Sequence, residues 1–193
     1  MKVLVLHHSY DGQTEGIARR LGEVIERAGH SAAVRRFTGP GSLDAVRDHD
    51  AVLLGAAIRY GHHDRAFERE VRRHAPALAA IPNAFFSVCL SAGGPGRNAH
   101  AAQGYIENFC RNTGWKPREA TSFAGALQYS RYGFFMKIMM RMIVGHAGGE
   151  TDTSRDYEYT DWRAVEEFAR AFVERLPARA VTGSNTPGIL APD

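Results

Sequence analysis

Cysteine is scarce in this chain, with only Cys89 and Cys110 among 193 residues. Two cysteines are too few for a disulfide framework, and they lack the CxxC spacing of redox and zinc motifs. Their scarcity favours a reducing compartment. Residues 1–30 also contain no apolar signal-peptide core, because their pattern is that of a strand followed by a helix. We therefore expect a cytoplasmic protein.

A strong charge imbalance is also absent. The chain has 24 lysines and arginines against 21 aspartates and glutamates, for a formal net charge of +3, and its isoelectric point is about 9.0. Duplex DNA would require a clustered basic face, so we expect no nucleic-acid partner. Anionic small molecules or an anionic membrane surface fit the mild basicity better.

No apolar run is long enough to cross a membrane. Residues 132–146 would form a helix of about 22 Å, which is shorter than the roughly 30 Å of a bilayer core. Most of this segment is large and apolar, and one narrow helical row would contain Gly133, Lys137, Arg141 and Gly145. Two interpretations stay open: a helix buried over a sheet, or a helix at a membrane interface or at a site for a large apolar molecule. In the second, the substrate or membrane contacts would be Phe134, Phe135, Lys137, Met140 and Arg141.

The sequence begins with a motif suited to a phosphate. Lys2 to His8 reads as an apolar strand, the loop Ser9-Tyr10-Asp11-Gly12-Gln13-Thr14 follows, and residues 13–28 have helical spacing. α/β proteins hold a terminal phosphate in this way, at the positive end of a helix. The P-loop lysine and the GxGxxG pattern are missing, so ATP, GTP and a Rossmann-bound NAD fit poorly. A single phosphate monoester fits, with FMN the natural candidate, although such residues also occur in ordinary turns.

Strands and helices alternate along the rest of the chain. Further strands are expected at 31–36, 51–57, 84–90 and 121–127, and further helices at 64–74, 99–112 and 161–176. This alternation predicts an α/β fold with a doubly wound, five-stranded parallel sheet in the flavodoxin-like order 2-1-3-4-5, with the apolar helical insert near the fifth strand. Ligands of such sheets bind at the carboxyl ends of the strands. We expect one FMN-binding domain at 1–176 and a disordered or weakly docked tail at 177–193.

Several stretches, in order along the chain, carry a more specific pattern: Asp11 to Thr14, Gly-Ala-Ala-Ile-Arg-Tyr-Gly-His at 55–62, and residues 124–127, 129–132, 148–153 and 159–162. Together they resemble the bacterial menaquinone-dependent protoporphyrinogen IX dehydrogenases, the short flavodoxin-like protoporphyrinogen oxidases of haem synthesis. The resemblance implies an FMN enzyme that removes six electrons and six protons from protoporphyrinogen IX. It also implies that the electrons pass to a respiratory quinone, menaquinone or ubiquinone, at the inner face of the cell membrane.

The resemblance further implies the cofactor-binding positions. The phosphate loop would comprise Ser9, Tyr10, Asp11, Gly12, Gln13 and Thr14. Two loops would clasp the isoalloxazine: Ala57, Ile58, Arg59, Tyr60 and Gly61, and Ser87, Val88, Cys89, Leu90 and Ser91. A later segment near the flavin would contribute Gly149, Thr151 and Asp152. The chain departs from the family in the glycine-rich residues 91–96, so no side-chain role is carried over there.

Simple chemistry refines some of these roles. Ser9 and Thr14 suit direct hydrogen bonds to the phosphate. The Asp11 carboxylate would repel a phosphate dianion, so we expect it to cap backbone N–H groups and to point outward. Arg59 could stabilise the anionic reduced flavin, or it could lie in solvent. Cys89 is expected to be a small buried filler rather than a nucleophile.

The catalytic residues stay open, with Arg59, Tyr60 and His62 as candidates. His62 could act as a general base, because a neutral imidazole accepts a proton near pH 7. We expect no metal, since the adjacent His62 and His63 point in different directions and no carboxylate or cysteine completes a ligand set. A flavin supplies the hydride chemistry itself, so a dedicated acid and base are not required.

Three other functions are compatible with such a scaffold. A flavodoxin-type electron carrier is disfavoured by the isoelectric point, because such carriers are usually acidic. An NAD(P)H-dependent FMN quinone reductase would need a nicotinamide site, and no dedicated motif for one is visible. A noncatalytic module that docks through the methionine-rich helix would bind no FMN.

Overall fold

A five-stranded parallel sheet forms the centre of the computed structural model, which describes residues 1–94, 97–127, 129–131, 145 and 152–177. Its strands are β1 (Lys2–His8), β2 (Ser31–Arg36), β3 (Ala51–Ala57), β4 (Asn83–Cys89) and β5 (Ala120–Ala124). They lie in the order β2-β1-β3-β4-β5, and every neighbouring pair is parallel. The predicted fold class and strand order are confirmed.

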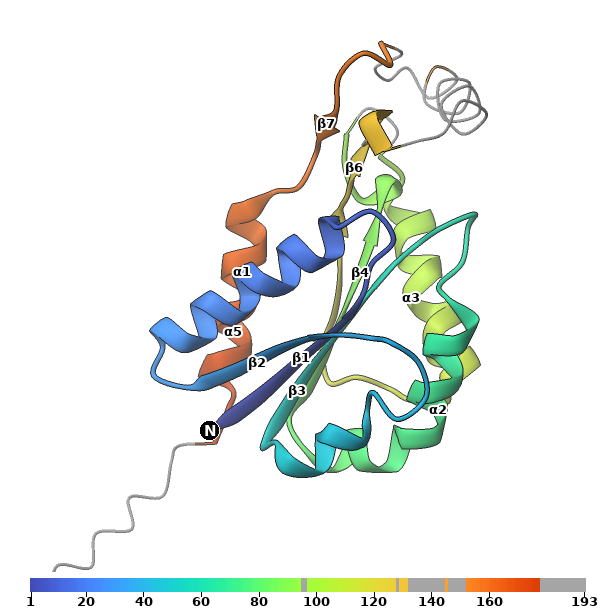
Figure 1. Ribbon diagram of the computed structural model, residues 1–193. Coiled ribbons are helices and arrows are strands. Elements are labelled where there is room, and N and C mark those ends of the chain that lie inside the picture. Colours follow the sequence, from blue (N-terminus) through green and yellow to red (C-terminus); the bar gives the residue numbers. More distant parts are fainter. Residues whose placement is uncertain (95–96, 128, 132–144, 146–151, 178–193) are drawn as a thin grey trace, which may run out of the picture.

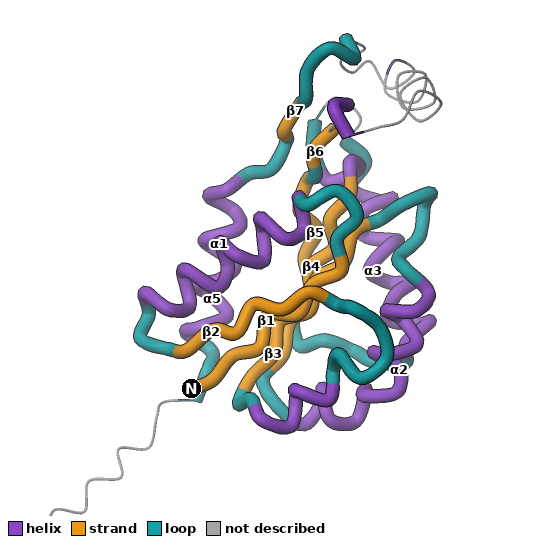
Figure 2. The backbone as a smooth tube through the Cα atoms, in the orientation of Figure 1, coloured by secondary structure: helices purple, strands orange, loops and turns teal. Residues whose placement is uncertain are grey.

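Two helical layers cover the sheet (Figure 1). Helices α1 (Gln13–Arg27) and α5 (Trp162–Glu174) pack together on one face, and α2 (Arg65–Ala80) and α3 (Ala99–Thr113) pack together on the other. The tube drawing shows the same two layers (Figure 2). Because both faces are covered, the central strands are apolar along their whole length rather than alternating.

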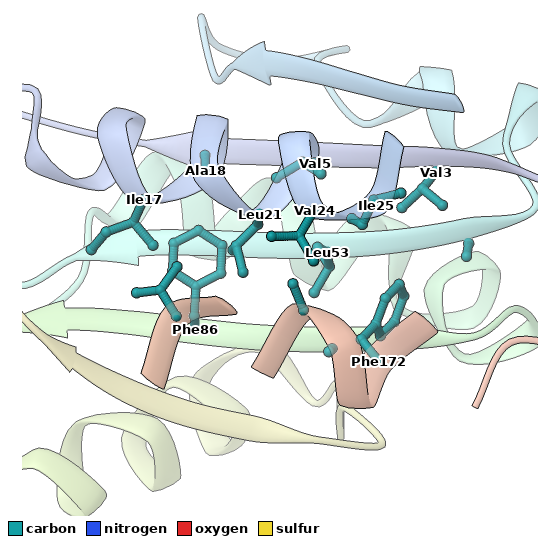
Figure 3. Close-up of a cluster of buried hydrophobic side chains, with 14 of the residues drawn as sticks. Val3, Val5, Ile17, Ala18, Leu21, Val24, Ile25, Leu53, Phe86 and Phe172 are labelled. Carbon is teal, nitrogen blue, oxygen red and sulfur yellow. The ribbon is translucent and has the colours of Figure 1, made fainter. Parts of the chain in front are cut away.

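The core consists of two clusters divided by the sheet. On the α1 and α5 face, Val3, Val5 and Leu53 pack against apolar residues of the two helices (Figure 3). On the α2 and α3 face, Leu4 and Leu6, which alternate with Val3 and Val5 along β1, belong to a second cluster that contains Phe85 and Phe109. Alternate side chains of a strand point to opposite faces, so each strand contributes to both clusters.

Side chains define where three of the helices begin. The Asp64 carboxylate accepts hydrogen bonds from the first-turn amides of α2, Asn98 does so for α3, and Asp161 for α5. Such caps satisfy amides that have no partner within the helix. Helix α1 differs, because its N-cap position is Gly12, which has no side chain to offer.

Two boundaries differ from the sequence prediction. Helix α2 continues through Pro76 to Ala80 rather than ending at residue 74, because Leu78 is fully buried in the core. The segment predicted as one strand at 121–127 is interrupted at Gly125. Beyond this glycine, β6 (Ala126–Leu127) leaves the main sheet and pairs antiparallel with β7 (Tyr157–Glu158). The sequence reading missed this small ribbon, as well as the short 3-10 turns, of which η1 (Asp44–Asp48) is the longest.

Some expectations lie outside the described residues. The apolar segment at 132–146 is described only at Gly145, and the tail at 177–193 only at residue 177. The domain boundary at 176 also stays a prediction. No helix within the described part of the chain is long and apolar enough to cross a membrane.

Gly55 on β3 lies beside Phe86 on β4, and a methyl group at position 55 would overlap the Phe86 ring. We expect Gly55→Ala to lower the free energy of unfolding by about 2 kcal/mol, since overpacking a rigid core forces neighbouring groups to move. Urea unfolding of the flavin-free protein measures the change. Gly104→Ala is the matched control, because open space surrounds this helical position, and we expect it to stabilise by up to about 1 kcal/mol. Equal effects of the two changes would contradict the packing argument.

Candidate functional site: a cleft at the carboxyl ends of the strands

A cleft of about 280 Å³ lies where β1, β3 and β4 end. Most of the residues predicted to bind the cofactor line it: Ser9, Tyr10, Asp11, Gln13, Thr14, Ala57, Ile58, Arg59, Tyr60, Gly61, Val88, Cys89, Leu90 and Ser91. The structure thus brings three loops together that are far apart in the sequence. Crevices at the carboxyl ends of strands are where open α/β sheets bind ligands.

The loop between β1 and α1 forms one end of the cleft. Ser9 and Thr14 are both almost fully buried, and the Gly12 amide donates a 3.0 Å hydrogen bond to Ser9 Oγ. Gly12 has a φ of 99°, a left-handed conformation that glycine adopts without strain. Two hydroxyls therefore lie at the positive end of a helix whose cap position carries no side chain, which is the chemistry that a phosphate monoester needs.

Arg36 and Gln13 fix this loop from outside. Arg36 Nη2 donates a 3.1 Å hydrogen bond to the Ser9 carbonyl. The Gln13 side-chain amide donates to Glu158 Oε1 and Thr160 Oγ1, each at 2.8 Å. Gln13 borders the cleft, but these bonds direct its amide toward β7 and the residues that follow it. Gly12 does not line the cleft, although it forms the turn.

The loop after β3 is a tight hairpin. Arg59 and His62 exchange two backbone hydrogen bonds, of 3.0 and 3.3 Å. Tyr60 and Gly61 between them both have positive φ, of 52° and 81°, as a two-residue type I′ turn requires. The Ile58 amide also donates a 2.8 Å hydrogen bond to the Val88 carbonyl, so this loop is tied to the end of β4.

A buried pair lies behind the two loops predicted to clasp the ring. His63 Nε2 and Ser87 Oγ share a 3.0 Å hydrogen bond, and both side chains are buried. The His63 ring packs edge-on against Phe85 and Phe109. Burial lowers the pKa of His63 to about 3, so the imidazole stays neutral. Ser87 was expected at the flavin, but its side chain braces the loop from behind and does not line the cleft.

Burial favours the protonated form of two side chains that line the cleft, Cys89 and Tyr10. Burial raises the pKa of the Cys89 thiol to about 11. Burial, followed by the Asp64 carboxylate, raises the pKa of the Tyr10 hydroxyl. A thiol with such a pKa is a poor nucleophile, which agrees with the structural role expected for Cys89.

Other predicted residues lie elsewhere. His62 is exposed, with its Nδ1 atom 2.9 Å from the His63 carbonyl, and it does not line the cleft. Asp152 is exposed and accepts hydrogen bonds from Ser154, which lower the pKa of its carboxyl. The remaining candidates fall outside the described residues: Phe134, Phe135, Lys137, Met140, Arg141, Gly149 and Thr151.

The structure adds three residues to the cleft lining: Tyr105, Gly125 and Ala126. Gly125 and Ala126 lie where the chain leaves the main sheet. A glycine within a predicted strand can indicate such an interruption, so Gly125 was the sequence signal for this part of the lining. Tyr105 lies in the middle of α3, and nothing in its local sequence distinguishes it from a core aromatic.

A separate polar cluster lies away from the cleft. His74 Nε2 is 2.9 Å from Asp44 Oδ1, and Glu70 Oε1 accepts a 2.7 Å hydrogen bond from the Gly41 amide. Among the described residues, Asp44, Glu70 and His74 are the ones whose potential metal-ligand atoms lie within 4.8 Å of one another. Because the atoms of this cluster already bond to one another and to the turn at 39–44, we assign it the structural role of holding that turn against α2.

The strand order, the loop after β1 and the position of the cleft together define a flavodoxin-like protein. Residues 4–154 match the model of the Flavodoxin domain family.

Two curated relatives extend the likeness. The protoporphyrinogen IX dehydrogenase [quinone] of Escherichia coli K12 is 39% identical over 173 residues, which cover 88% of this chain and 93% of the relative. A protein of the same name from Leishmania major is 38% identical over 175 residues, or 89% of this chain and 74% of the relative. The chain belongs to the flavodoxin-domain family and, within it, to the group of oxidoreductases that these relatives represent. The Leishmania relative shows that the group is not confined to bacteria.

Solved structures support the fold alone. The oxidised Flavodoxin 2 of Bacillus cereus has a TM-score of 0.57 at 16% identity and covers 91% of this chain, matched over 100% of its own length. The oxidised Flavodoxin 1 of the same organism has a TM-score of 0.52 at 17% identity, with coverages of 91% and 99%. The Flavodoxin domain family implies a flavin cofactor, and the two buried hydroxyls at the start of α1 fit its phosphate.

Proposed function

We propose that this protein is an FMN-dependent protoporphyrinogen IX dehydrogenase of haem synthesis. It would remove six electrons and six protons from each substrate molecule and reduce three quinones to quinols, with menaquinone or ubiquinone as the acceptor. The observation that carries the proposal is the cleft, which is lined by the hydroxyl-bearing loop after β1 and by the loops after β3 and β4. The chain is also 39% identical to a relative named as a protoporphyrinogen IX dehydrogenase.

The chain's own residues would position the reactants. Ser9 and Thr14 would hold the phosphate of FMN, and the backbone of the loops at 57–61 and 88–91 would enclose its ring. When bound, FMN supplies hydride acceptance from a carbon atom and onward transfer of electrons to a quinone. The apolar lining would exclude water from the reacting carbon. No histidine lies among the described residues that line the cleft, so we assign no general base.

An anaerobic turnover experiment tests this proposal. FMN-loaded protein is mixed with protoporphyrinogen IX and a soluble menaquinone analogue, and the fluorescence of the porphyrin product is followed. We expect continuous porphyrin formation that depends on both protein and quinone. Without the quinone each flavin accepts only two electrons, so at most one porphyrin forms for every three FMN molecules. NAD(P)H in place of porphyrinogen tests the quinone-reductase alternative. A rate equal to that of the enzyme-free control would overturn the proposal.

The proposal also includes a peripheral location on the inner face of the cell membrane. Quinones dissolve in lipid, the chain is mildly basic, and its apolar segment at 132–146 carries Lys137 and Arg141. An amphipathic segment with cations beside apolar residues suits an anionic lipid surface. We expect the FMN-loaded protein to sediment with anionic vesicles and not with zwitterionic ones. Equal sedimentation with the two would contradict this location.

A further inference from the structure

Arg59 lies beside the cleft with its guanidinium between two tyrosine rings. Its Cζ atom is 4.8 Å from the centroid of the Tyr10 ring and 5.7 Å from that of Tyr60. The Arg59 side chain is half-buried. The Tyr60 side chain is 67% exposed, unlike the other large hydrophobic side chains that the structure describes. Contact of a guanidinium with aromatic faces is attractive and keeps the group flat against the rings.

The backbone, rather than an acidic neighbour, determines the position of Arg59. The hairpin from Arg59 to His62 and the bond from Ile58 to β4 hold it in place. Within the described chain, no ion pair joins Arg59 to a carboxylate, whereas the helix-surface arginines Arg19 and Arg163 each pair with a glutamate. A guanidinium that forms no ion pair with a carboxylate of the described chain is suited to bind one from a ligand.

We infer that Arg59 binds a carboxylate of the substrate, namely a propionate of the tetrapyrrole. The inference rests on the proposed function and names the group of the substrate that is recognised. A guanidinium whose faces touch aromatic rings still presents its N–H edge, which matches a carboxylate with two parallel hydrogen bonds. The phosphate of the cofactor has its own hydroxyl donors in Ser9 and Thr14.

Comparing a diacid with its diester tests this role. The FMN-loaded wild type and Arg59→Met are assayed with protoporphyrinogen IX and with its dimethyl ester, in the same detergent. For the diacid we expect the variant to raise KM about tenfold with kcat nearly unchanged, because it loses a charge-assisted pair that solvent weakens at this half-exposed side chain. For the diester we expect no change. Arg59→Lys should restore part of the diacid affinity, and Arg65→Met, which removes an exposed arginine outside the cleft, should change neither.

A binding measurement separates this inference from the proposed function. Fluorescence titration of the FMN-loaded protein with protoporphyrin IX and with its dimethyl ester requires no turnover. If the wild type fails to oxidise either porphyrinogen, the proposed function fails, while a selective loss of diacid binding in Arg59→Met still supports the inference. Equal losses for diacid and diester, or weaker FMN binding in the variant, would overturn it and assign Arg59 to the cofactor or to folding.

Discussion

The double variant Ser9→Ala/Thr14→Val is expected to bind FMN about 100-fold more weakly than the wild type and to bind riboflavin with unchanged affinity. Each hydroxyl would donate a hydrogen bond to a phosphate oxygen, and bonds to charged groups contribute about 1.5–3 kcal/mol each. Both hydroxyls are almost fully buried at the cleft, so water cannot replace them well. Riboflavin lacks the phosphate and should not register their loss. Titration that follows flavin fluorescence gives both dissociation constants.

Two further variants make this result specific to the phosphate. Thr14→Ser keeps the hydroxyl and should retain most of the FMN affinity. Ser31→Ala/Thr38→Val removes two exposed hydroxyls outside the cleft and should have no effect. If the Ser9→Ala/Thr14→Val protein lost FMN and riboflavin affinity in equal measure, the loop would have a structural role only.

Acid is expected to destabilise the folded protein strongly through two buried histidines. Burial lowers the pKa of His63 to about 3 and that of His7 to about 4, from an ordinary value of 6.5. Below pH 6.5 the unfolded chain therefore binds protons that the folded chain does not. The resulting stabilisation is fully present above pH 6.5 and decreases as the pH falls toward the folded values. Between pH 7 and pH 5 each histidine should remove about 2 kcal/mol from the free energy of unfolding.

Replacing His63 isolates its share of the acid effect. Between these pH values the flavin-free His63→Gln variant should lose about 2 kcal/mol less stability in urea unfolding than the wild type. Ser87→Ala is the matched control, because it removes the hydrogen bond but keeps the imidazole. It should lower stability at every pH and preserve the acid slope. An unchanged slope in His63→Gln would show that this histidine does not remain neutral in the folded protein.

The sequence predicted the sheet because its signals are local and redundant. Continuous apolar strands and amphipathic helices both indicate the same alternation. The loop after β1 could be predicted to line the cleft for the same reason, since its residues are contiguous and follow the first strand directly. The loops after β3 and β4 were predicted from their positions in the strand order, together with the family resemblance, and they line the same cleft.

The parts that were missed depend on contacts between distant segments. Only the folded chain shows that the Ser87 side chain bonds to His63. Tyr105 reaches the cleft from the middle of α3. The ribbon of β6 and β7 pairs residues that are about 30 positions apart, and a two-residue strand has no period to detect.

The most direct test of the account is the response of the bound flavin to the proposed substrate. FMN-loaded protein is mixed anaerobically with protoporphyrinogen IX alone, and the absorbance of oxidised flavin is recorded before and after a quinone is added. We expect protoporphyrinogen IX to bleach the absorbance of oxidised flavin and to form porphyrin in proportion to the flavin reduced. The yellow colour should return when the quinone is added. A flavin that dithionite reduces but protoporphyrinogen IX leaves oxidised would contradict the account.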